Sequence, residues 1–189
     1  MDQFNEEVGK SKKKIVVITE QVLPISLKQF ATLFIEEGAA NSYKAYHESV
    51  KDTNVNMTSW TEAAPNNFTR EIKFLQPVNL PGLASTRGTK LQNYKKFGDY
   101  GLVLNSSTHL EDVPAADTFS VNDCLAVSAE DECSVKVEIS FAVVFIKSTF
   151  LKAMIEGPTN SEMKKWMAAF FENLKKVMHF QFSIIDYHC

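Results

Sequence analysis

Cysteine, glycine and proline are all scarce in this sequence, and long apolar runs are missing. Three cysteines without CxxC spacing make neither a zinc motif nor a complete disulfide framework, so we expect reduced thiols. Seven glycines and six prolines leave no low-complexity tract. No apolar stretch approaches the roughly 20 residues of a membrane-spanning helix, and no signal peptide is apparent. We therefore expect one domain over 14–178, on the cytoplasmic side of the cell, with an extension at 179–189.

Motifs of catalysis and of metal binding are also missing. The four histidines, His47, His109, His179 and His188, are scattered without metal-ligand spacing, and no GxSxG, P-loop or GxGxxG segment occurs. We therefore expect no enzyme activity, no catalytic residue, no metal and no cofactor. The net charge of −3 argues against a nucleic-acid partner, which usually requires a basic protein.

Phenylalanine and methionine are, by contrast, plentiful, at 14 and 6 residues. Large rings and flexible thioethers suit a cavity for a bulky apolar guest, although they serve equally in a solid core. Composition alone favours the solid core.

The periodicity of apolar residues divides the chain into helical and strand-like parts. Residues 1–13 are polar and basic, and we expect them to form a disordered tail. A β-branched strand at 15–18 precedes a helix that Ser26 caps, and a second helix covers 42–50. Strand-like segments follow at 54–60, 67–76, 87–96, 100–110, 117–128 and 133–146.

A long amphipathic helix closes this pattern. Thr159 and Glu162 have the spacing of a capping box, just after the breaker pair Gly157-Pro158, and an apolar stripe follows them. Because a sheet must bury its apolar face, this helix is its expected partner. The sequence therefore predicts an α+β fold, with a curved antiparallel sheet of about six to seven strands around the C-terminal helix.

Several short segments stand in a recognisable order between Trp60 and Lys176. Trp60 precedes a strand headed by Arg70, and a loop rich in proline and glycine then leads to a basic strand from Arg87. The remaining segments are Asp112-Val113-Pro114, Asp117, Phe119–Asn122 and Phe150–Glu156. In this order they resemble the VASt domain, the StART-like sterol-transfer module of the Aster/GRAM-domain and Lam families at membrane contact sites.

The resemblance implies a helix-grip fold that holds a sterol in a cavity beneath the final helix and transfers it between membranes. It also implies a parent protein with a GRAM domain and a membrane anchor, at endoplasmic reticulum contact sites. We expect a monomer. Three alternatives stay open: the cavity takes a phospholipid or fatty acid, the interior is solid and the domain binds a protein, or the fold carries an enzyme of the wider helix-grip superfamily.

By position, Pro77–Thr86 corresponds to the family's mobile loop at the mouth of the cavity. Proline and glycine do not suit a central strand, so we expect an exposed apolar lid made of Val78, Leu80, Pro81, Gly82 and Leu83. Nearby cations are expected to touch an anionic membrane surface briefly. They are Arg87, Lys90, Lys95 and Lys96.

The expected wall of the cavity comes from alternating strand positions and from the stripe of the final helix. It consists of Ile72, Phe74, Leu91, Val103, Val137, Ile139, Phe141, Trp166, Met167 and Phe170. A sterol hydroxyl needs a polar partner when it is buried. The candidates for that partner are Gln76, Asn93 and Ser107.

Overall fold

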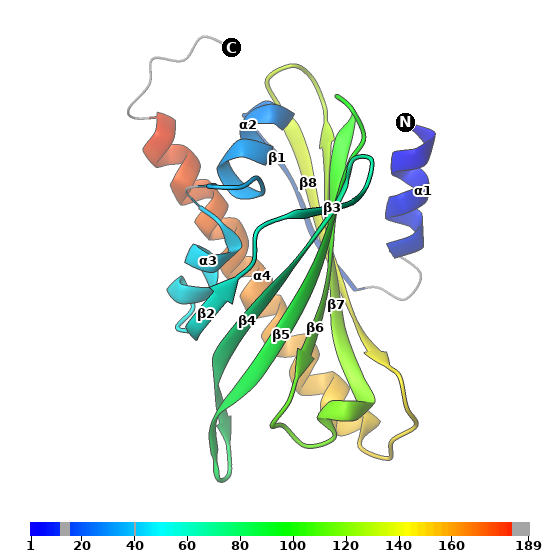
Figure 1. Ribbon diagram of the computed structural model, residues 1–189, viewed down its shortest axis with the longest axis vertical. Coiled ribbons are helices and arrows are strands. Elements are labelled where there is room, and N and C mark those ends of the chain that lie inside the picture. The colour runs from blue at the N-terminus through cyan, green and yellow to red at the C-terminus, as the bar shows by residue number, and fades with distance from the viewer. Residues whose placement is uncertain (12–15, 40, 183–189) are drawn as a thin grey trace.

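The computed structural model describes residues 1–11, 16–39 and 41–182 (Figure 1). Its centre is an eight-stranded sheet in the order β1-β8-β7-β6-β5-β4-β2, with β3 paired to β4, and every pairing is antiparallel. The strands are β1 Val16–Leu23, β2 Thr53–Met57, β3 Thr61–Ala64, β4 Asn67–Leu80, β5 Leu83–Lys96, β6 Gly101–Leu110, β7 Phe119–Ala129 and β8 Val135–Phe145.

Four helices accompany the sheet in the described part of the chain. They are α1 Asp2–Ser11, α2 Leu27–Phe34, α3 Tyr43–Ser49 and α4 Lys152–Phe182, and a 3₁₀ turn, η1, covers Ala116–Thr118. The α+β class and the large antiparallel sheet with a C-terminal helix are therefore confirmed. The strand that the sequence did not reveal is β3, whose four exposed residues carry no alternation.

The two faces of the sheet are covered by different helices. Lys90 of β5 lies over Trp166 of α4, with Nζ 4.5 Å from the ring centroid, so its side is the inner face. Lys95 of the same strand points the other way and pairs with Glu7 of α1 at 2.8 Å, which defines the outer face. Figure 1 accordingly shows α2, α3 and α4 on one side of the sheet and α1 on the other.

The beginning of the chain is helical, which corrects the expectation of a disordered tail at 1–13. The ring of Phe4 in α1 stands edge-on to Phe97 at 5.6 Å. Gly101 permits this packing, because a Cβ there would come within 2.7 Å of the Phe4 ring. Composition could not reveal the helix, since its apolar contacts come from strands that are distant in sequence. Residues 12 and 13 of the expected tail lie outside the described residues.

The start of α2 follows directly from its sequence. Ser26 Oγ accepts the N–H of Gln29 at 3.2 Å, and the Gln29 side chain accepts the N–H of Ser26 at 2.8 Å. This reciprocal pair is a capping box. The predicted N-cap is therefore confirmed.

The C-terminal helix is continuous, whereas the sequence predicted a break at Gly157-Pro158. Pro158 lies inside α4 and lacks the N–H that would bond the carbonyl of Met154. Pro158 and Met154 are both exposed, so water can donate a hydrogen bond to the carbonyl of Met154 instead. The helix continues into the expected extension at 179–189 as far as Phe182, and residues 183–189 lie outside the described residues.

The predicted lid is a β-hairpin rather than a loop. Leu80 of β4 pairs with Leu83 of β5, and Gly82 takes a φ of +77° in the tight turn between them. Pro77 is tolerated because β2 pairs with β4 no further than Leu75, so that β4 is an edge strand beyond this point. The result is a two-stranded ribbon that projects from one end of the sheet (Figure 1).

Two further observations bear on the sequence-based expectations. Cys124 is buried and belongs to no disulfide, but Cys133 is disulfide-bonded, which corrects the expectation of reduced cysteines. An odd number of cysteines excludes complete pairing but not a single bridge. None of the helices among the described residues is long and apolar enough to cross a membrane.

Candidate functional site

A row of polar side chains crosses the otherwise apolar inner face of the sheet. Arg70, Gln92, Ser106 and Asp123 are successive cross-strand partners on β4, β5, β6 and β7, and all four are buried. Arg70 Nε donates to Gln92 Oε1 at 2.7 Å, and Gln92 Nε2 donates to Ser106 Oγ at 3.4 Å. Lys90 Nζ lies 3.3 Å from Asp123 Oδ1, with these side chains 5% and 3% exposed. We call these five residues the polar row.

Arg70 is buried with part of its hydrogen-bonding capacity unused. Among the described residues its Nη2 has no hydrogen-bond partner, and no carboxylate forms an ion pair with its guanidinium. The ring of Trp60 lies against the guanidinium, with Cζ 4.0 Å from the centroid. Burial lowers the pKa of Arg70 to about 10, so the group remains a cation at neutral pH. A buried cation with a free donor is suited to bind an oxygen of a ligand.

Aromatic side chains of α3 and α4 face the polar row. The ring centroid of Tyr43 is 5.8 Å from both Arg70 Cζ and Lys90 Nζ. The hydroxyl of Tyr46 donates to the backbone carbonyl of Trp166 at 2.6 Å, which holds α3 against α4. Burial raises the pKa of Tyr43, so its hydroxyl stays protonated. The polar row therefore lies between the sheet and an aromatic wall.

Side chains between the sheet and α4 are buried at one end of the molecule and partly exposed at the other. On the inner face of β8, Phe141 is fully buried, whereas Val143 and Phe145 are only partly buried. The inner stripe of α4 is buried at Met167, Phe170, Leu174 and Met178, but no side chain at 152–166 is buried. We call the end of the molecule that holds Val143, Phe145 and the start of α4 the open end. Because Asp123 pairs with Phe141, the polar row lies where the packed part stops.

Most of the predicted wall residues do meet around this interior. Their side chains belong to the buried core or pack against it: Ile72, Phe74, Val137, Ile139, Phe141, Trp166, Met167 and Phe170. Gln76 is on the inner face as well, because it pairs with the fully buried Thr86, but it lies toward the β4–β5 hairpin.

Four predicted site residues, Leu91, Asn93, Val103 and Ser107, lie on the outer face, and their assignment to the inner cavity was wrong. Leu91 is 49% exposed, and Val103 is buried on the side of the sheet where α1 packs. The apolar residues of β5 did not identify its buried face, because the buried positions of this strand include the charged Lys90 and the amide Gln92. The polar row itself was therefore missed. Its only signal in the sequence is a set of polar residues at alternating positions.

The four cations expected to dock on membranes do not form one surface. Lys90 is buried on the inner face, and Lys95 bonds α1 on the outer face. Lys96 bonds a carboxylate just after α2, and Arg87 bonds Asp112 with Nη2 2.6 Å from Oδ1. Because successive side chains of a strand point to opposite faces, these cations are divided between the two faces of the sheet. The prediction of one basic patch was therefore wrong.

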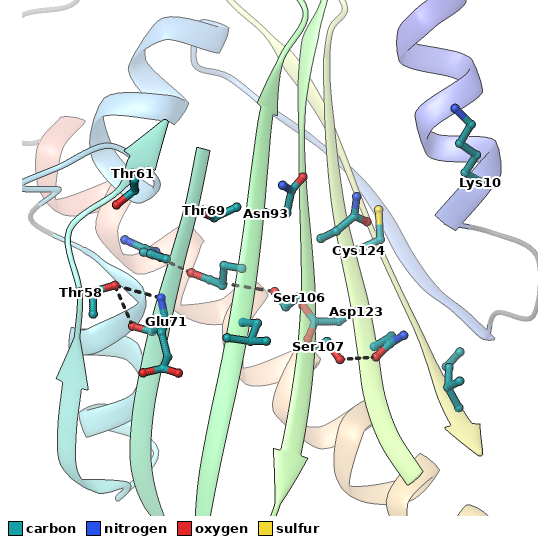
Figure 2. Close-up of a pocket in the computed structure, with 17 residues that line it drawn as sticks. Lys10, Thr58, Thr61, Thr69, Glu71, Asn93, Ser106, Ser107, Asp123 and Cys124 are labelled. Atoms are coloured by element: carbon teal, nitrogen blue, oxygen red, sulfur yellow. Dashed lines mark hydrogen bonds between the residues drawn. The ribbon is translucent and has the colours of Figure 1, made fainter. Parts of the chain in front are cut away.

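A hollow of about 860 Å³ lies on the outer face of the sheet (Figure 2). Figure 2 shows α4 passing behind the strands and Lys10 of α1 at the side of the hollow. Leu91, Asn93 and Ser107 line it, together with short polar side chains and with atoms of four residues of the polar row, Arg70, Gln92, Ser106 and Asp123. Ser107 Oγ donates to Asn122 Oδ1 at 2.9 Å. This hollow is open to solvent, and an open hollow does not shield an apolar guest from water, so the interior is the better candidate site.

A buried histidine beside the interior makes stability depend on pH. His47 Nδ1 lies 2.6 Å from Asp52 Oδ2, and both side chains are almost completely buried. Burial lowers the pKa of His47, against the opposing effect of the bond to Asp52. The unfolded chain therefore takes up a proton on this histidine at a higher pH than the folded chain does. Stability should then fall as the pH drops through the ordinary histidine range.

Urea denaturation between about pH 8 and pH 5 measures this effect. The wild-type protein should lose more free energy of unfolding over this range than His47→Gln, whose amide can still donate to Asp52. Equal losses in the two proteins would show that His47 does not set the pH dependence.

The sequence of this chain matches a known domain family and is similar to known proteins. The VASt family profile, "VAD1 Analog of StAR-related lipid transfer domain", matches residues 17–162. The chain is similar to "Protein VASCULAR ASSOCIATED DEATH 1, chloroplastic" of Arabidopsis thaliana, with 26% identity over 167 residues. It is also similar to "Uncharacterized membrane protein C20F10.07" of Schizosaccharomyces pombe, with 29% identity over 135 residues. These matches take in 84% and 69% of this chain, but only 28% and 17% of the relatives' lengths.

A solved structure shares the fold. The crystal structure of TTHA0849 from Thermus thermophilus has a TM-score of 0.53 and covers 89% of this chain and 99% of its own. The identity is 9%, so this likeness concerns the fold alone.

Proposed function

Because the chain belongs to the VASt family of StAR-related lipid-transfer domains, we propose that it holds one sterol between the inner face of the sheet and α4 and carries it between membranes. The family supports lipid binding and does not suggest catalysis. The wrapping of the sheet around α4 as a helix-grip fold belongs to this proposal. So does a place at endoplasmic reticulum contact sites within a longer protein, since the chain spans only 28% and 17% of its curated relatives.

The observation that carries the proposal is the polar row inside an apolar interior. A sterol is a large apolar body with one hydroxyl, and the hydroxyl must find a hydrogen-bond partner when it leaves water. Arg70 Nη2 is a buried donor without a partner among the described residues. Asp123 adds an acceptor carboxylate in the same row. A sterol entering with its hydroxyl first would meet these groups where the packed core begins.

The open end supplies the route for the apolar body of the lipid. Val143 and Phe145 of the sheet face this end, and the beginning of α4 borders it with side chains that are at most partly buried. The β4–β5 hairpin projects beside it (Figure 1). We assign α4 and this hairpin the role of a gate. The hairpin thus takes the place of the expected lid loop.

Energetics are compatible with exchange in both directions. At about 25 cal/mol per Å², shielding several hundred Å² of sterol surface from water is worth on the order of 10 kcal/mol. A bilayer shields the same surface, so the net free energy of transfer is small. The opening of the gate then sets the rate of exchange.

A second candidate ligand is an acidic lipid, such as a fatty acid or an anionic phospholipid. The unpaired charge on Arg70 favours it, because a buried cation gains most from an anionic partner. A carboxylate or phosphate would accept a bidentate hydrogen bond from the guanidinium, whereas a sterol hydroxyl accepts only one. The polar row therefore predicts competition between the two lipid classes at one site.

Native mass spectrometry of the purified protein and competition binding test these assignments. We expect a bound sterol whose displacement by a fatty acid depends on Arg70. Arg70→Met should weaken sterol binding about tenfold and fatty-acid binding more, because it removes the donor and the charge together. Lys73→Met, on the exposed face of the same strand, is the matched control and should bind like the wild type.

The outcomes separate the alternatives. If an acidic lipid copurifies with the protein and sterol does not compete with it, the ligand is the acidic lipid rather than the sterol. No bound lipid and no uptake of either class would indicate a solid interior and a protein-interaction module, which overturns the proposal.

A further inference from the structure

Apolar side chains are exposed where β8 passes into α4. Ile146 is 59% exposed, Phe150 is 95% exposed and Met154 is 73% exposed. Large apolar residues scattered singly over a surface are ordinary, but a group of them marks an interaction site. These three residues fall within one short segment of the chain. We call them the junction group.

A second apolar projection stands at the same end of the molecule. The strand directions place the β4–β5 turn and the end of β8 at one end of the sheet, as Figure 1 shows. The stretch 74–86 contains no charged residue, and Leu80 at the tip of the hairpin is 40% exposed. The two projections stand on either side of the open end. A partner that contacts both would therefore cover the entrance between them.

Carboxylates balance the cations near these projections. Lys152 lies between Phe150 and Met154 with Glu156 one turn further along α4, and the other two cations form ion pairs. Arg87 bonds Asp112 and Glu111, with Nη–Oδ1 and Nη–Oε2 distances of 2.6 and 3.0 Å. Lys147 Nζ bonds Asp117 Oδ2 at 2.6 Å. An anionic surface would gain little from cations that already have carboxylate partners. The chemistry of this end therefore fits an apolar or zwitterionic surface rather than an anionic one.

We propose that the open end docks on a zwitterionic lipid bilayer by inserting the junction group and the hairpin tip, with little contribution from charge. The inference rests on the proposed function, because a lipid that leaves through the open end must reach a bilayer without crossing water. It replaces the basic surface expected from the sequence. It also assigns the membrane contact to the start of α4, the part of that helix whose side chains are not buried against the sheet.

Cosedimentation with vesicles of pure phosphatidylcholine tests the docking surface. The wild-type protein should bind them equally at low and high salt, because screening weakens only charge-dependent attachment. Phe150→Asp should reduce the partition coefficient tenfold or more, since it removes one inserted aromatic side chain and adds a charge. Tyr100→Asp is the matched control. Tyr100 is 58% exposed in the β5–β6 turn, at the opposite end of the sheet, and its variant should bind like the wild type.

Several results would overturn the proposal. Wild-type binding that requires anionic lipid and disappears at high salt would assign docking to charge. Equal binding by Phe150→Asp and the wild type would show that the junction group does not insert into the bilayer. A wild-type protein that avoids vesicles but forms dimers lost in Phe150→Asp would assign the surface to a second copy of the chain.

Uptake of sterol from cyclodextrin, without any membrane, keeps this proposal separate from the proposed function. Phe150→Asp should take up sterol normally, because its side chain lies outside the interior. If the wild type binds vesicles but takes up no lipid, the lipid-carrier function fails and the docking surface stands. If it takes up lipid but does not bind vesicles, the docking proposal fails alone.

Discussion

Asp123→Ala should lower the free energy of unfolding by about 3–5 kcal/mol, because it leaves the ammonium of Lys90 buried without its carboxylate partner. Both side chains are almost completely buried, so water cannot replace the lost charge interaction. The Trp166 ring beneath Lys90 compensates only in part. Urea denaturation measures the loss, with the slope against urea checked for two-state behaviour.

A double variant distinguishes the lost partner from other damage at this position. Lys90→Met combined with Asp123→Leu removes both charges and keeps the volume, and it should restore most of the stability. Asp117→Ala breaks the exposed pair with Lys147 and is the surface control, and it should leave the free energy of unfolding almost unchanged. If the double variant were as unstable as Asp123→Ala, the buried ion pair would not be the cause.

The second large effect is expected at the boundary between the packed and open parts of the interior. Phe141→Ala should cost about 3–5 kcal/mol, because the fully buried ring would leave a cavity that its neighbours cannot fill. Phe145→Ala changes the same side chain on the same face of β8. It should cost clearly less, because Phe145 is only partly buried. Thermal or urea denaturation of the two variants compares them directly.

Lipid binding should show the opposite order for these two variants. Phe145 borders the open end, so its truncation should change the uptake of lipid at little cost in stability. Phe141 belongs to the packed part, so its truncation should act mainly on stability. Equal losses of stability in both variants would show that the interior is packed along its whole length. The open end would then not be an entrance for lipid.

Local signals predicted the elements whose stability depends on neighbours in sequence. The capping box at Ser26 and Gln29 requires residues three apart, and it formed as expected. The stripe of α4 is a periodic pattern, so the long helix was also predictable. Its start was not, because the effect of Pro158 on the helix depends on whether water reaches the carbonyl of Met154. The order of segments between Trp60 and Lys176 was sufficient to indicate the family.

The sequence by itself thus determined the α+β class, the terminal helix and the family. Only the tertiary structure decided which face of β5 is buried, because that depends on pairing with strands distant in sequence. A shift of one residue exchanges the two faces of a strand, and the charged and amide side chains at Lys90 and Gln92 concealed the correct choice. The same long-range contacts decide how α1 packs, where the polar row lies and which end of the interior is open. No local pattern could therefore reveal these features.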